Sequence, residues 1–241
     1  MHRKSQVFIV LFSLLSSSSV SAANLITNGS FEAPAGFAVG QQGVMPPSWV
    51  VTNVTPDLYS TDGSFGLSPN AFGNFPGVTA QNGLGWVAGW SLYPESFAQN
   101  VGTLLTPGVE YQIGGYLRQA LRSGLDSPGA YDILLNSSNS LTGSVAVARW
   151  APTTDANSWE FRTATFTAPL NANDLPWLIF RPYDGGSLTT YPGLDNVTLI
   201  AVPEPSSIAL LSTILVSLIA TSLSRNRRTK AMNRSARKRC N

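Results

Sequence analysis

Histidine and cysteine are missing from most of this 241-residue chain. The single histidine is His2 and the single cysteine is Cys240. Residues 24–201 therefore hold no Ser-His-Asp triad, no Cys-His pair and no histidine-ligated zinc site. They also form no disulfide, so this segment depends on packing for its stability. Any catalysis by residues 24–201 would have to use carboxylates.

Lysine is also missing from residues 24–201. Their five arginines stand against twelve acidic side chains, which gives a net charge of −7. The charge of +2 for the whole chain therefore comes from its basic ends. A strongly acidic segment without lysine is a poor match for phosphate backbones, so we expect no nucleic-acid partner.

Long apolar runs occur only near the two ends of the chain. At the start, Arg3 and Lys4 precede the apolar residues 7–15 and a stretch of small residues. This pattern is typical of a secretory signal peptide, here residues 1–22, and the mature chain would begin at Ala23 or Asn24. We therefore expect residues 24–201 to form an exported domain of a size that can enclose its own core.

The second apolar run lies near the C-terminus. No side chain between residues 208 and 223 is charged. A helix over residues 206–223 would span about 27 Å, close to the thickness of a hydrocarbon core. Eight basic residues follow it, and they place the tail, including residues 231–241, on the cytoplasmic side. They are Arg225, Arg227, Arg228, Lys230, Arg234, Arg237, Lys238 and Arg239.

The motif Pro203-Glu204-Pro205 directly precedes this predicted transmembrane helix. Together with the helix and the arginines, it resembles the PEP-CTERM sorting signal over residues 202–230. The resemblance implies an exosortase-type processing enzyme as a partner. It also implies a membrane-anchored form before sorting, and then a location at the cell surface or in the extracellular matrix. The tail beyond Lys230 is longer than is usual for this signal.

Many short strands are predicted between the two ends. Period-2 alternation is visible in residues 161–166, and Gly and Pro turn signals separate the segments. No segment has a long apolar repeat of 3.6 residues, which favours an all-β antiparallel sandwich. The expected strands are 24–27, 48–53, 85–90, 96–101, 110–118, 131–135, 145–150, 160–167, 178–181 and 194–200.

Several of these segments resemble a known fold family. Residues 24–32, 96–101, 159–169 and 194–199 are similar to strands of jelly-roll carbohydrate-binding modules of the family four and nine type. The resemblance implies a jelly-roll β-sandwich over residues 24–201 and an extracellular polysaccharide as ligand. Because galactose-binding-like domains of many functions share this fold, the resemblance concerns architecture more than ligand.

Sugar sites need flat aromatic faces beside polar groups. Trp86 and Trp90 are four residues apart in a Gly-rich segment, so a strand would place both on one face, with Tyr93 just beyond. We predict this group as the sugar platform; the alternative is that both tryptophans belong to the core. Tyr183, at the edge of a second Gly-rich loop, is a further expected contact. Trp49 and Trp159 are expected in the core.

A structural calcium ion is expected near Glu32 and Asp195. In the jelly-roll family that the motifs resemble, an ion of this kind often lies where the first and last strands meet. If residues 25–31 pair with residues 194–200, the two carboxylates meet and repel unless a cation or proton joins them. The alternative is that Asp195 caps a turn and Glu32 is solvated.

Three functions remain open from the sequence. The first is a non-catalytic glycan-binding protein of the cell envelope. The second is a structural matrix protein with the same fold and no specific ligand. The third is a glycoside-cleaving enzyme that uses a pair of carboxylates, although no local pattern among the twelve acids marks such a pair.

Overall fold

The computed structural model describes residues 23–183 and 189–203. The predicted signal peptide, Glu204 and Pro205 of the sorting motif, the predicted transmembrane helix at 206–223 and the basic tail lie outside these ranges. Pro203 is described and is exposed. Within the described ranges, no helix has the length and apolar character needed to cross a membrane.

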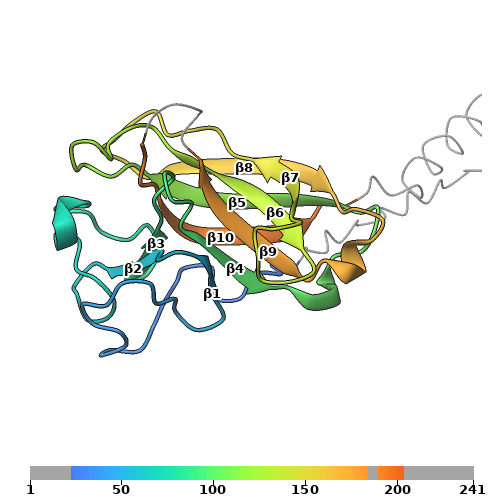
Figure 1. Ribbon diagram of the computed structural model, residues 1–241, viewed down its shortest axis with the longest axis horizontal. Helices are drawn as coiled ribbons and strands as arrows, with labels where there is room; N and C mark the ends of the chain where they lie inside the picture. Colours follow the sequence, from blue (N-terminus) through green and yellow to red (C-terminus); the bar gives the residue numbers. More distant parts are fainter. Residues whose placement is uncertain (1–22, 184–188, 204–241) are drawn as a thin grey trace, which may run out of the picture.

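The described residues form two five-stranded antiparallel sheets that pack face to face (Figure 1). The first sheet runs in the order β1 (Val50–Asn53), β4 (Ser96–Asn100), β9 (Trp177–Tyr183), β6 (Ala130–Asn136) and β7 (Val145–Arg149). The second runs β2 (Asp57–Ser60), β3 (Gly85–Ala88), β10 (Gly193–Ala201), β5 (Glu110–Arg118) and β8 (Glu160–Thr167). Three short 3-10 turns accompany them: η1 (Ala71–Gly73), η2 (Gly102–Leu104) and η3 (Ala172–Asp174). The predicted jelly-roll sandwich is confirmed.

Most of the predicted strands are present. β5 and β8 have the predicted bounds, because alternating side chains between turn residues define them well. Strand β2 was not predicted, and the predicted strand at 24–27 is not formed. That segment nevertheless lies along β10, since the backbone N–H of Leu25 donates to the carbonyl of Leu199 at 2.8 Å.

An aromatic core fills the space between the sheets. The Trp49 ring lies 4.7 Å from that of Phe31, 5.8 Å from that of Phe97 and 5.7 Å from that of Phe180. Trp49 is only 4% exposed, which confirms its predicted place in the core. The buried residues of this cluster run from Ile26 to Leu199. Because the described part encloses its own core, we expect residues 23–203 to fold independently.

A second apolar cluster covers the outer face of β2 and β3. In β3, Val87 faces the main core, whereas Trp86 belongs to the second cluster together with Tyr59 and Phe75. All four residues of β3 are buried as a result. Trp159 packs against this cluster and donates its indole N–H to the carbonyl of Thr79 at 2.8 Å. Trp159 is therefore a partly buried packing residue, close to its predicted role.

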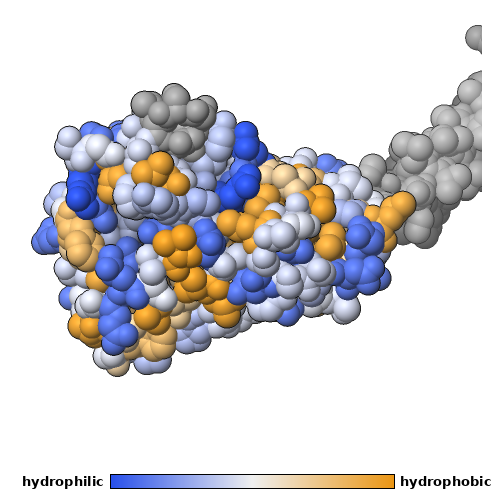
Figure 2. All heavy atoms as spheres, in the orientation of Figure 1, coloured by the Kyte–Doolittle hydropathy of each residue, from blue (hydrophilic) through white to orange (hydrophobic). Residues whose placement is uncertain are grey.

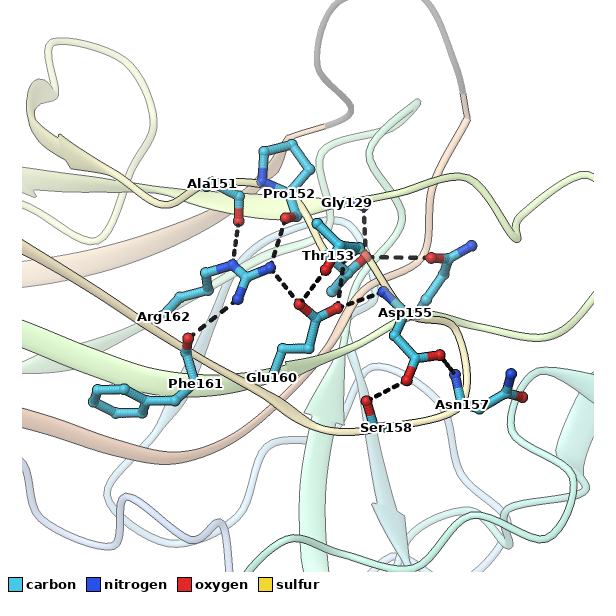
Figure 3. Close-up of polar contacts among 12 residues, drawn as sticks. Gly129, Ala151, Pro152, Thr153, Asp155, Asn157, Ser158, Glu160, Phe161 and Arg162 are labelled. Atoms are coloured by element: carbon cyan, nitrogen blue, oxygen red, sulfur yellow. Dashed lines mark hydrogen bonds and ion pairs between the residues drawn. The ribbon is translucent and has the colours of Figure 1, made fainter.

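A polar network holds the loop that precedes β8 (Figure 3). The carboxylate of Glu160 accepts hydrogen bonds from the backbone N–H groups of Thr154 and Asp155 and from the Thr154 hydroxyl. It also pairs with Arg162 at 2.6 Å. Burial favours a higher pKa for Glu160, but these donors outweigh it and lower the pKa to about 2. The network therefore remains intact over the physiological pH range.

Candidate binding site

A pocket of about 390 Å³ is lined by residues of η1, β2 and the loops near β2 and β3. Figure 1 shows β2 and β3 at one end of the sandwich. The pocket wall is built from segments that are far apart in the sequence. The side chains that matter for its chemistry are Asp57, Asn74, Trp90, Glu95, Arg122 and Tyr191. On the face shown in Figure 2, apolar and hydrophilic side chains are interspersed.

Asp57 is the first residue of β2 and is only 3% exposed. The hydroxyl of Tyr191 donates to Asp57 Oδ2, and the backbone N–H of Gly43 donates to Oδ1 at 3.4 Å. Burial raises the pKa of Asp57 above its ordinary value, even though these hydrogen bonds act in the opposite direction. Asp57 is thus a buried acid that faces a pocket.

Glu95 closes a turn directly before β4. The backbone N–H of Trp90 donates to Glu95 Oε2 at 2.8 Å, and the backbone N–H of Glu95 donates back to the carbonyl of Trp90 at 3.0 Å. Glu95 is 7% exposed. Burial raises its pKa to about 7, and the nearby charge of Asp57 acts in the same direction. At neutral pH, Glu95 therefore exists in both the neutral and the charged form.

Neutral polar groups link the floor of the pocket. Asn74 Nδ2 donates to the Tyr59 hydroxyl at 2.9 Å, and the hydroxyls of Tyr59 and Tyr191 are 3.3 Å apart. Burial raises the pKa of both phenols, which keeps them neutral. Among the described residues, neither Asn74 Oδ1 nor Trp90 Nε1 has a hydrogen-bond partner. An acceptor and a donor beside the pocket are therefore unpaired.

The structure separates the predicted aromatic platform into two parts. Trp90 is half-buried and lines the pocket, and the exposed ring of Tyr93 meets it edge-on, with 5.2 Å between ring centroids. Trp86, in contrast, is 0% exposed, so the prediction that its ring contacts a sugar is wrong. The residues between β2 and β3 fold over its face of the sheet and bury it within the second apolar cluster.

Tyr183 lines a different pocket of about 310 Å³ and does not join Trp90. The guanidinium carbon of Arg149 lies 3.7 Å from the centroid of the Tyr183 ring. Arg149 and Arg181 both pair with the buried carboxylate of Asp132. Burial of Asp132 favours a higher pKa, but the two arginines lower it overall. One face of Tyr183 is therefore already occupied by a cation.

The predicted calcium ligands are close in space. The backbone N–H of Val197 donates to the carbonyl of Gly29 at 2.8 Å, so the first segment runs antiparallel to β10 as expected. Burial raises the pKa of Asp195 to about 7, and the charge of Glu32 contributes to this shift. The two carboxylates thus interact, although no cluster of three or more acidic, histidine or cysteine ligands occurs in the described ranges.

Backbone N–H groups of residues 81–85 already bond to this pair. Asp195 Oδ2 accepts from Gln81 and Asn82 at 2.8 and 2.9 Å, and Glu32 Oε1 accepts from Leu84 and Gly85 at 2.8 and 2.9 Å. Carboxylate oxygens suit calcium, and the second oxygen of Glu32 receives none of these N–H groups. Asp195 Oδ1 accepts from the backbone N–H of Asn196 at 2.6 Å, so both oxygens of Asp195 already have backbone donors, and the calcium ion stays a prediction.

No family model matches the sequence, and no curated protein matches it. Similar structures do exist. A cyclase from Fischerella sp. TAU aligns with a TM-score of 0.51 at 17% identity, over 77% of this chain and 100% of that one. The CBM22-1 xylan-binding domain of Xyn10C from Paenibacillus barcinonensis aligns with a TM-score of 0.44 at 11% identity, over 76% of this chain and 97% of that one. TmCBM61, solved with β-1,4-galactotriose, aligns with a TM-score of 0.41 at 16% identity, over 75% and 100%.

These neighbours share a fold, not a demonstrated function. The match to the cyclase, at 17% identity, shows the fold alone. Because a fold does not fix a function, the function of this chain has to be argued from its own pocket.

Sequence analysis did not identify Asp57, Asn74 or Glu95 as site residues. Asp57 lies in β2, which is only four residues long and was not predicted as a strand. A signal was present at Glu95, because an acid follows the predicted aromatic contacts Trp90 and Tyr93 within five residues. Nothing local indicates that the three side chains line one pocket, because they come from separate segments of the chain.

The raised pKa of Glu95 predicts a pH dependence of stability. The folded-state pKa of about 7 lies above the ordinary value of 4.5, so the native protein binds the proton more tightly than the unfolded chain does. The free energy of unfolding should therefore fall as the pH rises from 5 to 8, by about 2 kcal/mol from this group. Urea unfolding at several pH values measures the change.

The matched comparison is Glu95→Gln, which keeps the shape of the side chain without its charge. Its free energy of unfolding should depend less steeply on pH between 5 and 8 than that of the wild type. Other titrating groups are common to both proteins and cancel in the difference. Parallel pH profiles of the two proteins would contradict the prediction.

Proposed function

We propose that this protein is an exported, non-catalytic glycan-binding protein that binds extracellular polysaccharide in the pocket next to Trp90. The observation that carries the proposal is the composition of the pocket wall. Trp90 supplies an aromatic surface beside Asp57 and Glu95, within a cavity of about 390 Å³. A single sugar unit of a chain fits a cavity of this size, which is at the small end of ligand sites.

Each part of the wall has a role in binding a sugar. The apolar face of a pyranose ring packs against an aromatic ring, and its hydroxyls require polar partners. Asp57 accepts hydrogen bonds from hydroxyls, whereas Glu95 either accepts or donates, because its pKa is about 7. The exposed ring of Tyr93 next to Trp90 extends the apolar surface towards the neighbouring sugar of a chain.

The ends of the chain support the proposed location. A signal peptide at residues 1–22 would direct export, and the Pro203-Glu204-Pro205 motif with the helix at 206–223 would hold the protein in the membrane for an exosortase. The protein would then reach the cell surface or the extracellular matrix. The acidic charge of residues 24–201 and their lack of lysine agree with a partner other than nucleic acid.

Trp90→Ala is expected to weaken glycan binding by about 1–3 kcal/mol, or roughly 5- to 150-fold, by analogy with stacking of bases on aromatic side chains. A glycan array of residues 23–203 identifies the ligand, and calorimetry with that oligosaccharide measures the loss. Trp177→Ala is the matched control, because Trp177 is also half-buried but lines another pocket. Equal losses in the two variants, or a loss only in Trp177→Ala, would place the site elsewhere.

The second candidate function is carboxylate-based glycoside cleavage. The observation in its favour is that two buried acids with raised pKa values line the same pocket. The same samples distinguish the two functions. Hydrolysis would release reducing ends from the glycan, and Glu95→Gln would abolish that release. If no glycan binds and none is cleaved, a structural matrix protein without a specific ligand is the remaining function.

A further inference from the structure

We infer that the pocket selects amino sugars with a free, protonated amine over neutral or N-acetylated sugars. This inference rests on the proposed function and specifies the class of glycan that the site prefers. It starts from the ion pairs of the described residues. Their three ion pairs involve only Asp132 and Glu160 as acids.

Asp57 and Glu95 are thus buried acids without a cationic partner in the described part of the chain. They are 3% and 7% exposed, and each has only neutral hydrogen-bond donors. Buried carboxylates that face one pocket repel each other and lose solvation unless a proton or a cation compensates them. A ligand that brings a positive charge offsets both the repulsion and the lost solvation, whereas a neutral sugar supplies hydrogen bonds but leaves the repulsion between the two charges.

The other groups of the pocket also suit an ammonium group. An ammonium has three N–H donors and no acceptor. The residues that line the pocket include three with acceptor oxygens, namely Asp57, Glu95 and Asn74, whose buried Oδ1 accepts no bond from a described residue. Trp90 lines the same cavity, and tryptophan is the best aromatic partner for a cation.

Arg122 is the cationic residue among the side chains that line the pocket. It lies in the loop that precedes Leu125, and it forms no ion pair with Asp57 or Glu95. Its guanidinium would repel an ammonium at close range. We therefore expect Arg122→Ala to keep or increase the preference for amines. This result would show that the preference comes from the two acids and not from Arg122.

The test compares a glucosamine tetramer with an N-acetylglucosamine tetramer by calorimetry on residues 23–203. Measurements run at several pH values between about 6 and 8, because the preference requires both a protonated amine and an ionised carboxylate, and Glu95 has a pKa of about 7. We expect the glucosamine tetramer to bind at least about tenfold more tightly. Glu95→Gln should reduce this ratio to about one, and Asp57→Asn should reduce it in the same direction.

Glu110→Gln is the control acid, because Glu110 is exposed at the start of β5, at the opposite end of that strand from Arg118 and the loop that carries Arg122. Its preference should equal that of the wild type. Thermal melts check that each variant is folded. Equal affinity for the two tetramers, or tighter binding of the acetylated one, would overturn the inference while leaving glycan binding intact. If no glycan binds at all, the proposed function itself fails.

Discussion

Replacing Trp86 with alanine is expected to lower the free energy of unfolding by about 3–5 kcal/mol. The Trp86 side chain is 0% exposed, and its ring stacks on that of Tyr59 with 5.4 Å between centroids. The rings of Phe75 and Trp159 meet it edge-on at 6.0 and 6.3 Å. Removing the indole therefore leaves a large cavity. For a domain of this size, the melting temperature should fall by about 6–20 °C, measured by calorimetry on residues 23–203.

Two variants make this test specific. Trp90→Ala should cost much less stability, because Trp90 is half-buried at the pocket wall and not in the centre of the cluster. Trp86→Phe should fall between Trp86→Ala and the wild type, because it keeps an aromatic ring and because Trp86 Nε1 forms no hydrogen bond with any described residue. A melting temperature of Trp86→Ala within about 2 °C of the wild type would contradict the assignment to the core.

Calcium is expected to stabilise the same domain by about 2.7 kcal/mol when it exceeds its dissociation constant about a hundredfold. This corresponds to a rise of roughly 5–10 °C in melting temperature relative to EDTA. The reason is the pair formed by Glu32 and Asp195, whose charges raise the free energy of the folded state. Extracellular calcium modules bind at about 0.1–1 mM, so the titration should extend to about 100 mM.

The control has to distinguish the stabilising effect of a calcium ion from that of the backbone hydrogen bonds that Asp195 and Glu32 also accept. Glu32→Gln and Asp195→Asn each keep an oxygen that can accept from the backbone N–H groups of residues 81–85, and each removes one charge of the pair. Only a metal site predicts that these variants lose the calcium-dependent rise, while Glu110→Gln keeps it. Coincident wild-type curves in EDTA and in calcium would show that the backbone N–H groups alone hold the pair.

Local sequence was sufficient for the sandwich and for most of its strands. In β5 and β8, alternation between turn residues is a property of neighbours in the chain, so both strands could be predicted to the residue. Strand β2 was missed because four residues that follow a proline carry too little periodicity. Its four side chains are all buried, since one face packs in the main core and the other beneath the second cluster.

The sequence by itself determined the chemistry available to this domain, and only the tertiary structure decided where that chemistry lies. The absence of histidine, cysteine and lysine leaves residues 24–201 with carboxylates, amides, hydroxyls, aromatic rings and five arginines. Trp86 and Trp90 look equivalent in the sequence, but long-range folding of the chain over β3 buries only the first. Asp57 and Glu95 come from different strand ends, and each becomes a functional candidate only because packing removes water and brings both to one cavity.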